Sequence, residues 1–383
     1  MDDDAGPTER ALAWAATMGG HRGGIGLRVA HEGGARSIGA LVTLGRKERE
    51  TQEDRDLAPG ATRASGAGDR ARPEEPDEVR TCFERDRDRI LHSTAFRRLA
   101  GKTQVFVFPA DHQRTRLTHA LEVAQVATSV ARALRLNVAL VEAIALGHDC
   151  GHGPGGHASE DAFEPYLAGG YDHAVWGADV VLAPLNLTAE VLDGIRNHSW
   201  SRPAPSTAEG EVVSWADRIA YCAHDLEDAV AAGLVTPADI PDIVRAHCGE
   251  TRSSQLRAFI ADLVSTSTEA ELVAMGDDMA GALVALRTFN YTRVYTRPEA
   301  NAQGASVVRL LRALVDHFAG NPDDATDARR VREPGSEDAV RRAVAYVAGM
   351  TDRYACETAL RLLGWPVSAL PRGFDVPGEA RRA

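Results

Sequence analysis

Two neighbouring stretches decide the fold class: RLTHALEVAQVATSVARAL at residues 116–134 and VALVEAIALGHDCGHGPGGH at residues 138–157. In the first stretch, apolar residues recur at spacings of three and four, which is the period of an amphipathic helix. The second stretch is apolar with little strand-like alternation until Gly147 and Gly151, and glycine commonly terminates helices. The same helical period returns later, in residues 211–233, 253–265, 269–295, 306–320 and 336–364. The sequence therefore predicts an all-α protein.

The composition is that of a globular protein without a large basic surface. The chain has 383 residues, and its formal net charge of −12 argues against a broad nucleic-acid-binding face. No apolar run approaches the ~20 residues that span a bilayer. The acidic start MDDDAGPTER lacks the regions of a signal peptide. The five cysteines are scattered and form no C-x-x-C pair, which favours a reducing compartment. We therefore expect a cytoplasmic protein without a membrane partner.

The first 75 residues differ from the rest of the chain. They are rich in Gly, Ala, Arg, Asp and Glu, and Trp14 is their one aromatic residue. Such a segment buries too little apolar surface to offset the entropy of ordering it. We expect residues 1–75 to form a disordered extension, and residues 76–383 to form a folded domain with a C-terminal helical part.

Metal-capable side chains are densest in GHDCGHGPGGH, residues 147–157, which contains His148, Asp149, His152 and His157. Imidazole and carboxylate together suit Zn²⁺, Fe²⁺, Mn²⁺ or Mg²⁺. Adjacent residues on a regular helix point about 100° apart, so His148 and Asp149 must lie at a helix end to meet one ion. A histidine-rich turn can also serve only for capping, but four such residues in so short a segment favour a metal site.

Two helical stretches carry further candidates. Arg116 and His119 are three residues apart and share one helix face. Asp217, Tyr221 and Asp225 are spaced by four residues and lie along one stripe of a second helix. A carboxylate within an apolar stripe is costly to bury unless it is paired or binds a metal. The alternative, an exposed acidic stripe with salt bridges, stays open at this point.

The order of these motifs resembles the HD phosphohydrolase superfamily. More specifically, the chain resembles the deoxynucleoside triphosphate triphosphohydrolases, the bacterial dGTPase-like proteins. The resemblance extends from about Asp86 to Leu363. It is carried by five blocks in order: DRDRILHSTAFRRLAGKTQVF, RTRLTHALEVAQVA, GHDCGHGPGGH, ADRIAYCAHDLEDA and GMTDRYA. The resemblance implies an HD-domain helical bundle with additional C-terminal helices.

The resemblance also implies roles for individual residues. Four residues match the metal ligands of the family: His119, His148, Asp149 and Asp217. Three residues match its additional active-site histidines: His152, His157 and His173. The metal would be divalent, and Mg, Mn, Fe and Zn all stay open. A histidine near its ordinary pKa of ~6.5 can protonate a leaving oxygen. We assign His157 to protonation of the leaving oxygen and His152 to orienting or deprotonating the attacking water. The reverse assignment stays open.

Other matched residues would contact the substrate. Arg116 matches the arginine that binds the phosphates, and a guanidinium suits phosphate because it binds in a bidentate manner. Gln104 and Val105 fall where the family contacts the deoxyribose. Tyr221 and Asp225 fall where the family packs against the sugar and binds its 3′-hydroxyl. A late segment, LRTFNYTRVYTRP at residues 286–298, resembles a further phosphate- and sugar-contacting segment in looser register; its candidates are Arg287, Tyr291, Arg293 and Tyr295.

The implied activity is hydrolysis of a deoxynucleoside triphosphate, with dGTP preferred, to deoxynucleoside and triphosphate. The resemblance further implies a homo-oligomer, and it allows a nucleotide effector and nucleic acid as a modulator; the net charge does not support nucleic-acid binding. Two alternatives stay open. One is another HD activity, a nucleotide phosphodiesterase or pyrophosphohydrolase. The other is a nucleotide-binding regulator without turnover. A metalloprotease is remote, because glycines and a proline interrupt the helix that its H-E-x-x-H motif needs.

Three positions need separate interpretation. Relatives usually carry Phe where this chain has Gly155, so an apolar plug of the glycine turn is missing. Relatives also commonly read H-N-x-Q after the turn, whereas DHAVWGADVV at residues 172–181 keeps His173 and lacks the amide pair. His198 is either a cavity-lining residue or a structural histidine. These departures leave the expected metal ligands intact and leave the substrate preference open.

Overall fold

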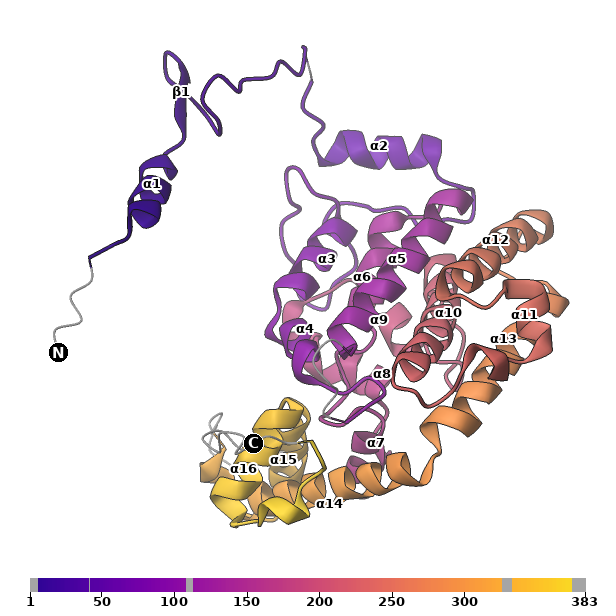
Figure 1. The fold of residues 1–383 in the computed structure, drawn as a ribbon. Helices are drawn as coiled ribbons and strands as arrows, with labels where there is room; N and C mark the ends of the chain where they lie inside the picture. The colour runs from indigo at the N-terminus through magenta and orange to yellow at the C-terminus, as the bar shows by residue number, and fades with distance from the viewer. Residues whose placement is uncertain (1–5, 41, 108–112, 326–332, 374–383) are drawn as a thin grey trace. The chain divides into compact units, whose positions relative to one another are not determined.

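The computed structural model describes residues 6–40, 42–107, 113–325 and 333–373. Contacts divide the chain into two units, Met1–Leu44 and Gly45–Ala383. The first unit contains helix α1 (Glu9–Thr17) and a small antiparallel hairpin of β1 (His21–Gly24) and β2 (Leu27–Val29). The second unit is helical, which confirms the predicted all-α class (Figure 1).

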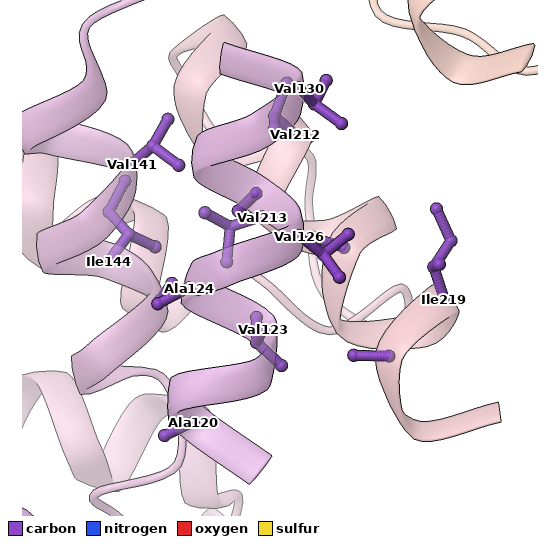
Figure 2. Close-up of a cluster of buried hydrophobic side chains, with 14 of the residues drawn as sticks. Ala120, Val123, Ala124, Val126, Val130, Val141, Ile144, Val212, Val213 and Ile219 are labelled. Carbon is purple, nitrogen blue, oxygen red and sulfur yellow. The ribbon is translucent and has the colours of Figure 1, made fainter. Parts of the chain in front are cut away.

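Three helices form the centre of the second unit: α5 (Arg116–Leu134), α6 (Val138–Gly147) and α10 (Ala208–Ala231). Around them lie α3 (Cys82–His92), α9 (Ala189–Arg196) and α12 (Arg252–Ala270) (Figure 1). Figure 2 shows the side chains that join the three central helices, all of them apolar; the labelled residues are Ala120, Val123, Ala124, Val126, Val130, Val141, Ile144, Val212, Val213 and Ile219. Burial of these stripes is the main force that holds the bundle together.

Local signals in the sequence set the ends of these helices. The Asn137 side chain accepts a hydrogen bond from the backbone of Leu140 and so begins α6. Gly147 is the last residue of α6, and His148 follows as its C-cap. Thr207 caps the start of α10 in the same way as Asn137 caps α6. The chain therefore leaves the apolar bundle at His148, where the metal-capable residues begin.

A second apolar core lies in the C-terminal part of this unit. It is built mainly by α14 (Pro298–Gly320), α15 (Glu337–Ala348) and α16 (Asp352–Leu363), with α7 (Ala158–Phe163) packed against α14 (Figure 1). The remaining α-helices are α2 (Arg46–Asp56), α4 (Thr94–Arg98), α8 (His173–Trp176), α11 (Asp242–Cys248) and α13 (Asp277–Asn290). Short 3₁₀ or π turns are η1 (Leu99–Gly101), η2 (Glu164–Tyr166), η3 (Gly177–Val181), η4 (Ala183–Leu185), η5 (Pro237–Asp239), η6 (Tyr291–Tyr295), η7 (Pro322–Asp324) and η8 (Val367–Ala369). Within the described ranges, no helix has both the length and the apolarity to cross a bilayer.

The contacts divide the chain between residues 44 and 45, whereas the sequence predicts a boundary near residue 75. Residues 45–70 hold their place through buried polar contacts. The Glu209 carboxylate accepts hydrogen bonds from the backbone N and the hydroxyl of Thr62, at 3.0 and 2.8 Å. Arg70 forms a fully buried ion pair with Asp86 at 2.5 Å. The composition of this segment predicts disorder. Buried polar pairings are not seen at that stage because, unlike apolar periodicity, they leave no pattern in the sequence.

Candidate metal centre

Four side chains that are distant along the chain meet at one end of the central bundle. His119 comes from α5, His148 and Asp149 follow the end of α6, and Asp217 comes from α10. The His119 Nε2 atom lies 3.0 Å from Asp217 Oδ1, and His148 Nε2 lies 3.7 Å from the same oxygen. His148 Nε2 is also 3.4 Å from Asp149 Oδ1. Ligand atoms about 2.1 Å from a tetrahedral ion are roughly 3.4 Å apart. His119, His148 and Asp217 offer ligand atoms that all lie within 4.8 Å of one another, and Asp149 adjoins this group through His148, so a small closure of the side chains would suit one ion.

The hydrogen bonding of His148 supports a metal ligand at this position. Its Nδ1 atom lies 2.7 Å from the carbonyl oxygen of Ala145 and therefore carries the proton that it donates. The Nε2 atom is left with a lone pair, and it is buried without a hydrogen-bond partner. Metal-binding histidines commonly donate their other N–H to a carbonyl or carboxylate, as His148 does. The residues present therefore fit a divalent ion.

The charges around the centre favour ionised carboxylates. Burial opposes ionisation of Asp149, yet Arg116 and His148 hold the pKa of its carboxyl well below the ordinary value. Burial acts the same way on Asp217, and the hydrogen bond from His119 lowers its pKa below the ordinary range. Burial lowers the pKa of His119, but Asp217 outweighs it and raises that pKa. Both carboxyl groups are therefore anions at neutral pH, the form that binds a cation.

The three additional histidines form a group beside this centre. His152 and His173 stack with ring centroids 3.7 Å apart, and His157 meets His152 edge-on at 4.8 Å. His152 and His173 are buried, whereas the His157 side chain is 76% exposed. The Glu160 carboxylate links the group, because it lies 3.0 Å from His157 Nδ1 and 2.9 Å from His173 Nδ1. The sequence analysis did not predict Glu160 as a site residue. The one signal for it in the sequence is its position three residues after His157.

The expected phosphate-binding residue is buried in the same place. The Arg116 Nη1 atom donates to Asp149 Oδ2 at 2.7 Å. Its Nε and Nη2 atoms are buried and have no hydrogen-bond partner. A Cβ atom on Gly156 would lie 2.7 Å from Nη2, so the glycine turn passes directly over the guanidinium. Of the expected sugar contacts, Gln104 has a buried Oε1 without a partner, and Val105 packs against the apolar core.

The polar side chains of the α10 stripe form hydrogen bonds with other residues of the same chain. The Tyr221 hydroxyl accepts a hydrogen bond from Arg287 Nε at 2.9 Å. The Asp225 carboxylate accepts from both Arg114 and Tyr295. The structure thus brings part of the 286–298 segment to α10, although the family resemblance matched that segment only in a loose register. The other two candidates in that segment, Tyr291 and Arg293, are exposed, and Arg293 lies 3.8 Å from Asp239.

Comparison with known proteins identifies the family. The family model for the HD domain matches residues 116–222, and the family model for the phosphohydrolase-associated domain matches residues 273–361. A deoxyguanosinetriphosphate triphosphohydrolase-like protein from Caldanaerobacter subterraneus subsp. tengcongensis is 43% identical over 322 residues, covering 81% of this chain and 94% of the relative. The chain belongs to this HD-domain, dGTPase-like family. A protein of the same name from Desulfatibacillum aliphaticivorans is 40% identical over 338 residues, covering 80% and 95%.

The HD match contains all four expected metal ligands, and HD proteins of this kind are metal-dependent phosphohydrolases. The associated domain contacts the glycine turn that follows the centre through Asp352, at the start of α16. The Asp352 carboxylate accepts hydrogen bonds from the backbone of Thr103 at 3.0 Å and of Gly155 at 2.8 Å. Lys102 spans the same junction, because its ammonium group donates to the carbonyl oxygens of His152 and Ala348. In this dGTPase-like protein, the associated domain therefore packs against the glycine turn of the HD domain.

The structure gives a physical reason for Gly155. Its φ angle of +73° is one that side chains rarely adopt, and an added Cβ atom would overlap a methyl group of Val307. We expect Gly155→Ala to lower the free energy of unfolding by about 1–3 kcal/mol, through backbone strain and overpacking. Urea unfolding measures this change.

A matched control for Gly155→Ala is Gly169→Ala. The latter position has open space around the added methyl group. Its unfolding free energy should stay within about 0.5 kcal/mol of the wild-type value. Equal stability of the Gly155→Ala variant and the wild-type protein would contradict the assigned contact with Val307.

Proposed function

We propose that this protein hydrolyses a deoxynucleoside triphosphate, with dGTP preferred, to deoxynucleoside and inorganic triphosphate. The observation that carries the proposal is the convergence of the four expected metal ligands beside Arg116, whose buried Nε and Nη2 atoms have no partner. The names of the relatives support a nucleoside triphosphate as substrate. A divalent ion is proposed as the cofactor, with Mg, Mn, Fe and Zn as candidates.

Arg116 is the residue best placed to hold the triphosphate. It is 2% exposed, and one of its nitrogens is already fixed by Asp149. The two uncommitted nitrogens offer hydrogen bonds to phosphate oxygens, and such charge-assisted bonds are stronger than neutral ones. When bound, a divalent ion supplies polarisation of the phosphoryl group and activation of water near neutral pH. Arg116 would orient the α-phosphorus against that centre.

Proton transfer falls to the histidine group. Cleavage of the Pα–O5′ bond expels an alkoxide, which needs a proton. The exposed His157 can meet the leaving oxygen, and its Nδ1 atom is held by Glu160. We assign His157 as this acid, a role typically worth 10²–10⁴-fold. His152, whose two ring nitrogens are buried and whose Nε2 atom lies 3.3 Å from Asp149 Oδ1, would orient the attacking water.

The sugar would lie along the α10 stripe. Tyr221 is positioned by Arg287 and would pack against C2′, where a 2′-hydroxyl would clash. Asp225 already accepts from Arg114 and Tyr295. A carboxylate has about four acceptor positions, so Asp225 retains capacity for a 3′-hydroxyl. Gln104 and Val105 are proposed to complete the contacts with the deoxyribose.

The cellular setting is also part of the proposal. All five cysteines are free and buried, which supports a reducing cytoplasm. A homo-oligomer and a nucleotide effector are proposed from the family resemblance alone.

The test is incubation of Mn²⁺-reconstituted protein with each of the four dNTPs and with GTP in ¹⁸O-water, followed by mass spectrometry. We expect deoxyguanosine and triphosphate from dGTP, with the ¹⁸O in the triphosphate, because water attacks phosphorus. Release of pyrophosphate and dGMP would instead identify a pyrophosphohydrolase. Tight nucleotide binding without any product would identify a regulator.

A further inference from the structure

One acidic side chain of the associated domain holds two segments that flank Arg116. Asp352 is the first residue of α16, and it is 8% exposed. Its Oδ2 atom accepts hydrogen bonds from the backbone N of Thr103 at 3.0 Å and from the Thr103 hydroxyl at 2.5 Å. Its Oδ1 atom accepts from the backbone N of Gly155 at 2.8 Å. Each carboxylate oxygen is therefore bound to a different segment of the chain.

The segment at Thr103 leads into the proposed sugar contacts. Gln104 and Val105 follow Thr103 directly in the chain. Thr103 is buried, and it pairs with Thr115 in an isolated antiparallel bridge at the start of α5. The position of Thr103 therefore sets where Gln104 and Val105 lie relative to α5.

The segment at Gly155 covers the guanidinium of Arg116. A Cβ atom added to the next residue, Gly156, would lie 2.7 Å from Arg116 Nη2 and 2.9 Å from the carbonyl oxygen of Thr103. Gly155 and Gly156 have φ angles of +73° and +64°, and neither has a side chain that could anchor the turn by packing. Hydrogen bonds of the backbone have to hold this part of the turn, and Asp352 accepts the one from Gly155.

Docking of the associated domain does not depend on this carboxylate. An apolar core that includes Phe163 of α7 and Leu311 of α14 already joins the two matched regions. Burial raises the pKa of Asp352, and the hydrogen bonds from Thr103 and Gly155 offset this only in part. A carboxyl group whose pKa is raised by folding costs stability at neutral pH. The two segments that Asp352 holds therefore explain its placement better than cohesion of the domains does.

We propose that Asp352 is a positioning residue through which the associated domain sets the affinity for the nucleotide and the preference for deoxyribose over ribose. Its carboxylate keeps Gln104 and Val105 at the sugar and keeps the glycine turn over Arg116. Because Arg116 is also fixed by Asp149, loss of this positioning weakens binding more than it slows the chemical step. The inference rests on the proposed function, since it takes a deoxynucleoside triphosphate as the ligand.

The direct test is Asp352→Asn in the full-length, Mn²⁺-reconstituted protein. The amide has nearly the same shape but a single acceptor oxygen, and its NH₂ group would face the N–H donor of one of the two segments. The KM for dGTP should rise about tenfold while kcat changes by less than about threefold. The ratio of kcat/KM for dGTP to kcat/KM for GTP should fall by at least about threefold, because the sugar contacts are displaced.

Asp338→Asn is the matched control. Asp338 also lies in the first turn of a helix of the associated domain, α15, but it is exposed and pairs with Arg342 of the same helix. This variant should keep the wild-type KM and the wild-type preference for dGTP over GTP. An unchanged KM and an unchanged preference in folded Asp352→Asn would overturn the proposal.

A milder variant keeps the proposal testable where Asp352→Asn does not fold. Thr103→Val removes the hydroxyl that donates to Asp352, while the shape of the side chain and the backbone N–H are kept. Its KM for dGTP should rise about threefold with kcat nearly unchanged. A wild-type KM in this variant, or a fall in kcat without a change in KM, would overturn the positioning role.

Failure of the proposed activity is recognised separately. A wild-type protein that leaves every dNTP and GTP intact refutes the activity, and the same proteins are then compared by equilibrium dialysis with dGTP and with GTP. Asp352→Asn should bind dGTP about tenfold more weakly than the wild-type protein, and Asp338→Asn should bind it equally well. Equal dissociation constants for Asp352→Asn and the wild-type protein, or no binding of dGTP by the wild-type protein, would overturn the positioning role.

Discussion

Replacing Asp149 by alanine is expected to abolish turnover while the helical circular-dichroism spectrum stays nearly unchanged. Asp149 is 3% exposed and lies 2.7 Å from Arg116 and 3.4 Å from His148. The variant would therefore lose a proposed metal ligand, and with it the anchor of Arg116, the residue proposed to bind the phosphates. Metal stabilisation of a transition state is worth several kcal/mol, and each 1.36 kcal/mol is tenfold in rate. We expect a loss of at least about 10³-fold in kcat, measured by chromatography of the deoxyguanosine released from dGTP.

Further variants separate lost chemistry from lost folding. Asp149→Asn keeps a hydrogen-bond acceptor for Arg116 but is a poorer ligand, so it should fold well and still lack turnover. His148→Ala removes only the metal ligand and should be equally inactive. Asp161→Ala, an exposed acidic residue of α7, should retain the wild-type rate. Wild-type activity in Asp149→Ala or in His148→Ala would contradict the assignment of the centre.

Replacing Asp86 by alanine is expected to cause a large loss of stability, about 3–5 kcal/mol. Its side chain is completely buried and pairs with Arg70 at 2.5 Å, while its second oxygen accepts from the backbone of Thr188 at 2.7 Å. Removing the Asp86 carboxylate leaves the buried Arg70 with Glu74, 2.9 Å away, as its remaining anionic partner, and leaves the Thr188 N–H without its acceptor. The loss should appear in urea unfolding as a lower midpoint with an unchanged slope.

Asp88 provides the matched control, two residues further along the same helix. It pairs with Arg80 at the surface, where the Arg80 side chain is 46% exposed. Exposed pairs contribute about 0–1 kcal/mol, so Asp88→Ala should cost no more than that. Equal losses of unfolding free energy in the two variants would contradict the conclusion that the Arg70–Asp86 ion pair holds residues 45–70 against α3.

The helical bundle could be predicted because its signals are local and repeated. The spacing of apolar residues gave α5, and the glycines after the apolar run placed the end of α6 close to His148. Helix geometry then required His148 and Asp149 to lie at a helix end, where the structure has them. Their meeting with Asp217 needed the family resemblance, because no local pattern relates residues so far apart.

Other features of the candidate site depend on contacts that the sequence does not encode. Glu160 and Arg114 were not predicted to contribute, since a lone acidic or basic residue near a motif is ordinary. Their roles appear only when Glu160 meets His173 and when Arg114 meets Asp225. The same holds for Gly155, whose missing side chain is matched by Val307 on a distant helix.

In residues 45–70, the sequence predicts disorder where the structure has order. Its composition resembles that of the extension before it, so its low apolar content predicts disorder. Order comes instead from individual polar contacts, such as Thr62 with Glu209 and Arg70 with Asp86. Composition is an average over a segment, so it does not show that two or three buried polar side chains have hydrogen-bond or ion-pair partners.

The most direct measurement is anomalous scattering at the manganese edge from crystals grown with Mn²⁺. We expect a peak at about 2.0–2.3 Å from ligand atoms of His119, His148, Asp149 and Asp217. The absence of a peak between these four residues at saturating Mn²⁺, or a crystal structure in which any of the four side chains turns away from the others, would contradict the proposed metal centre.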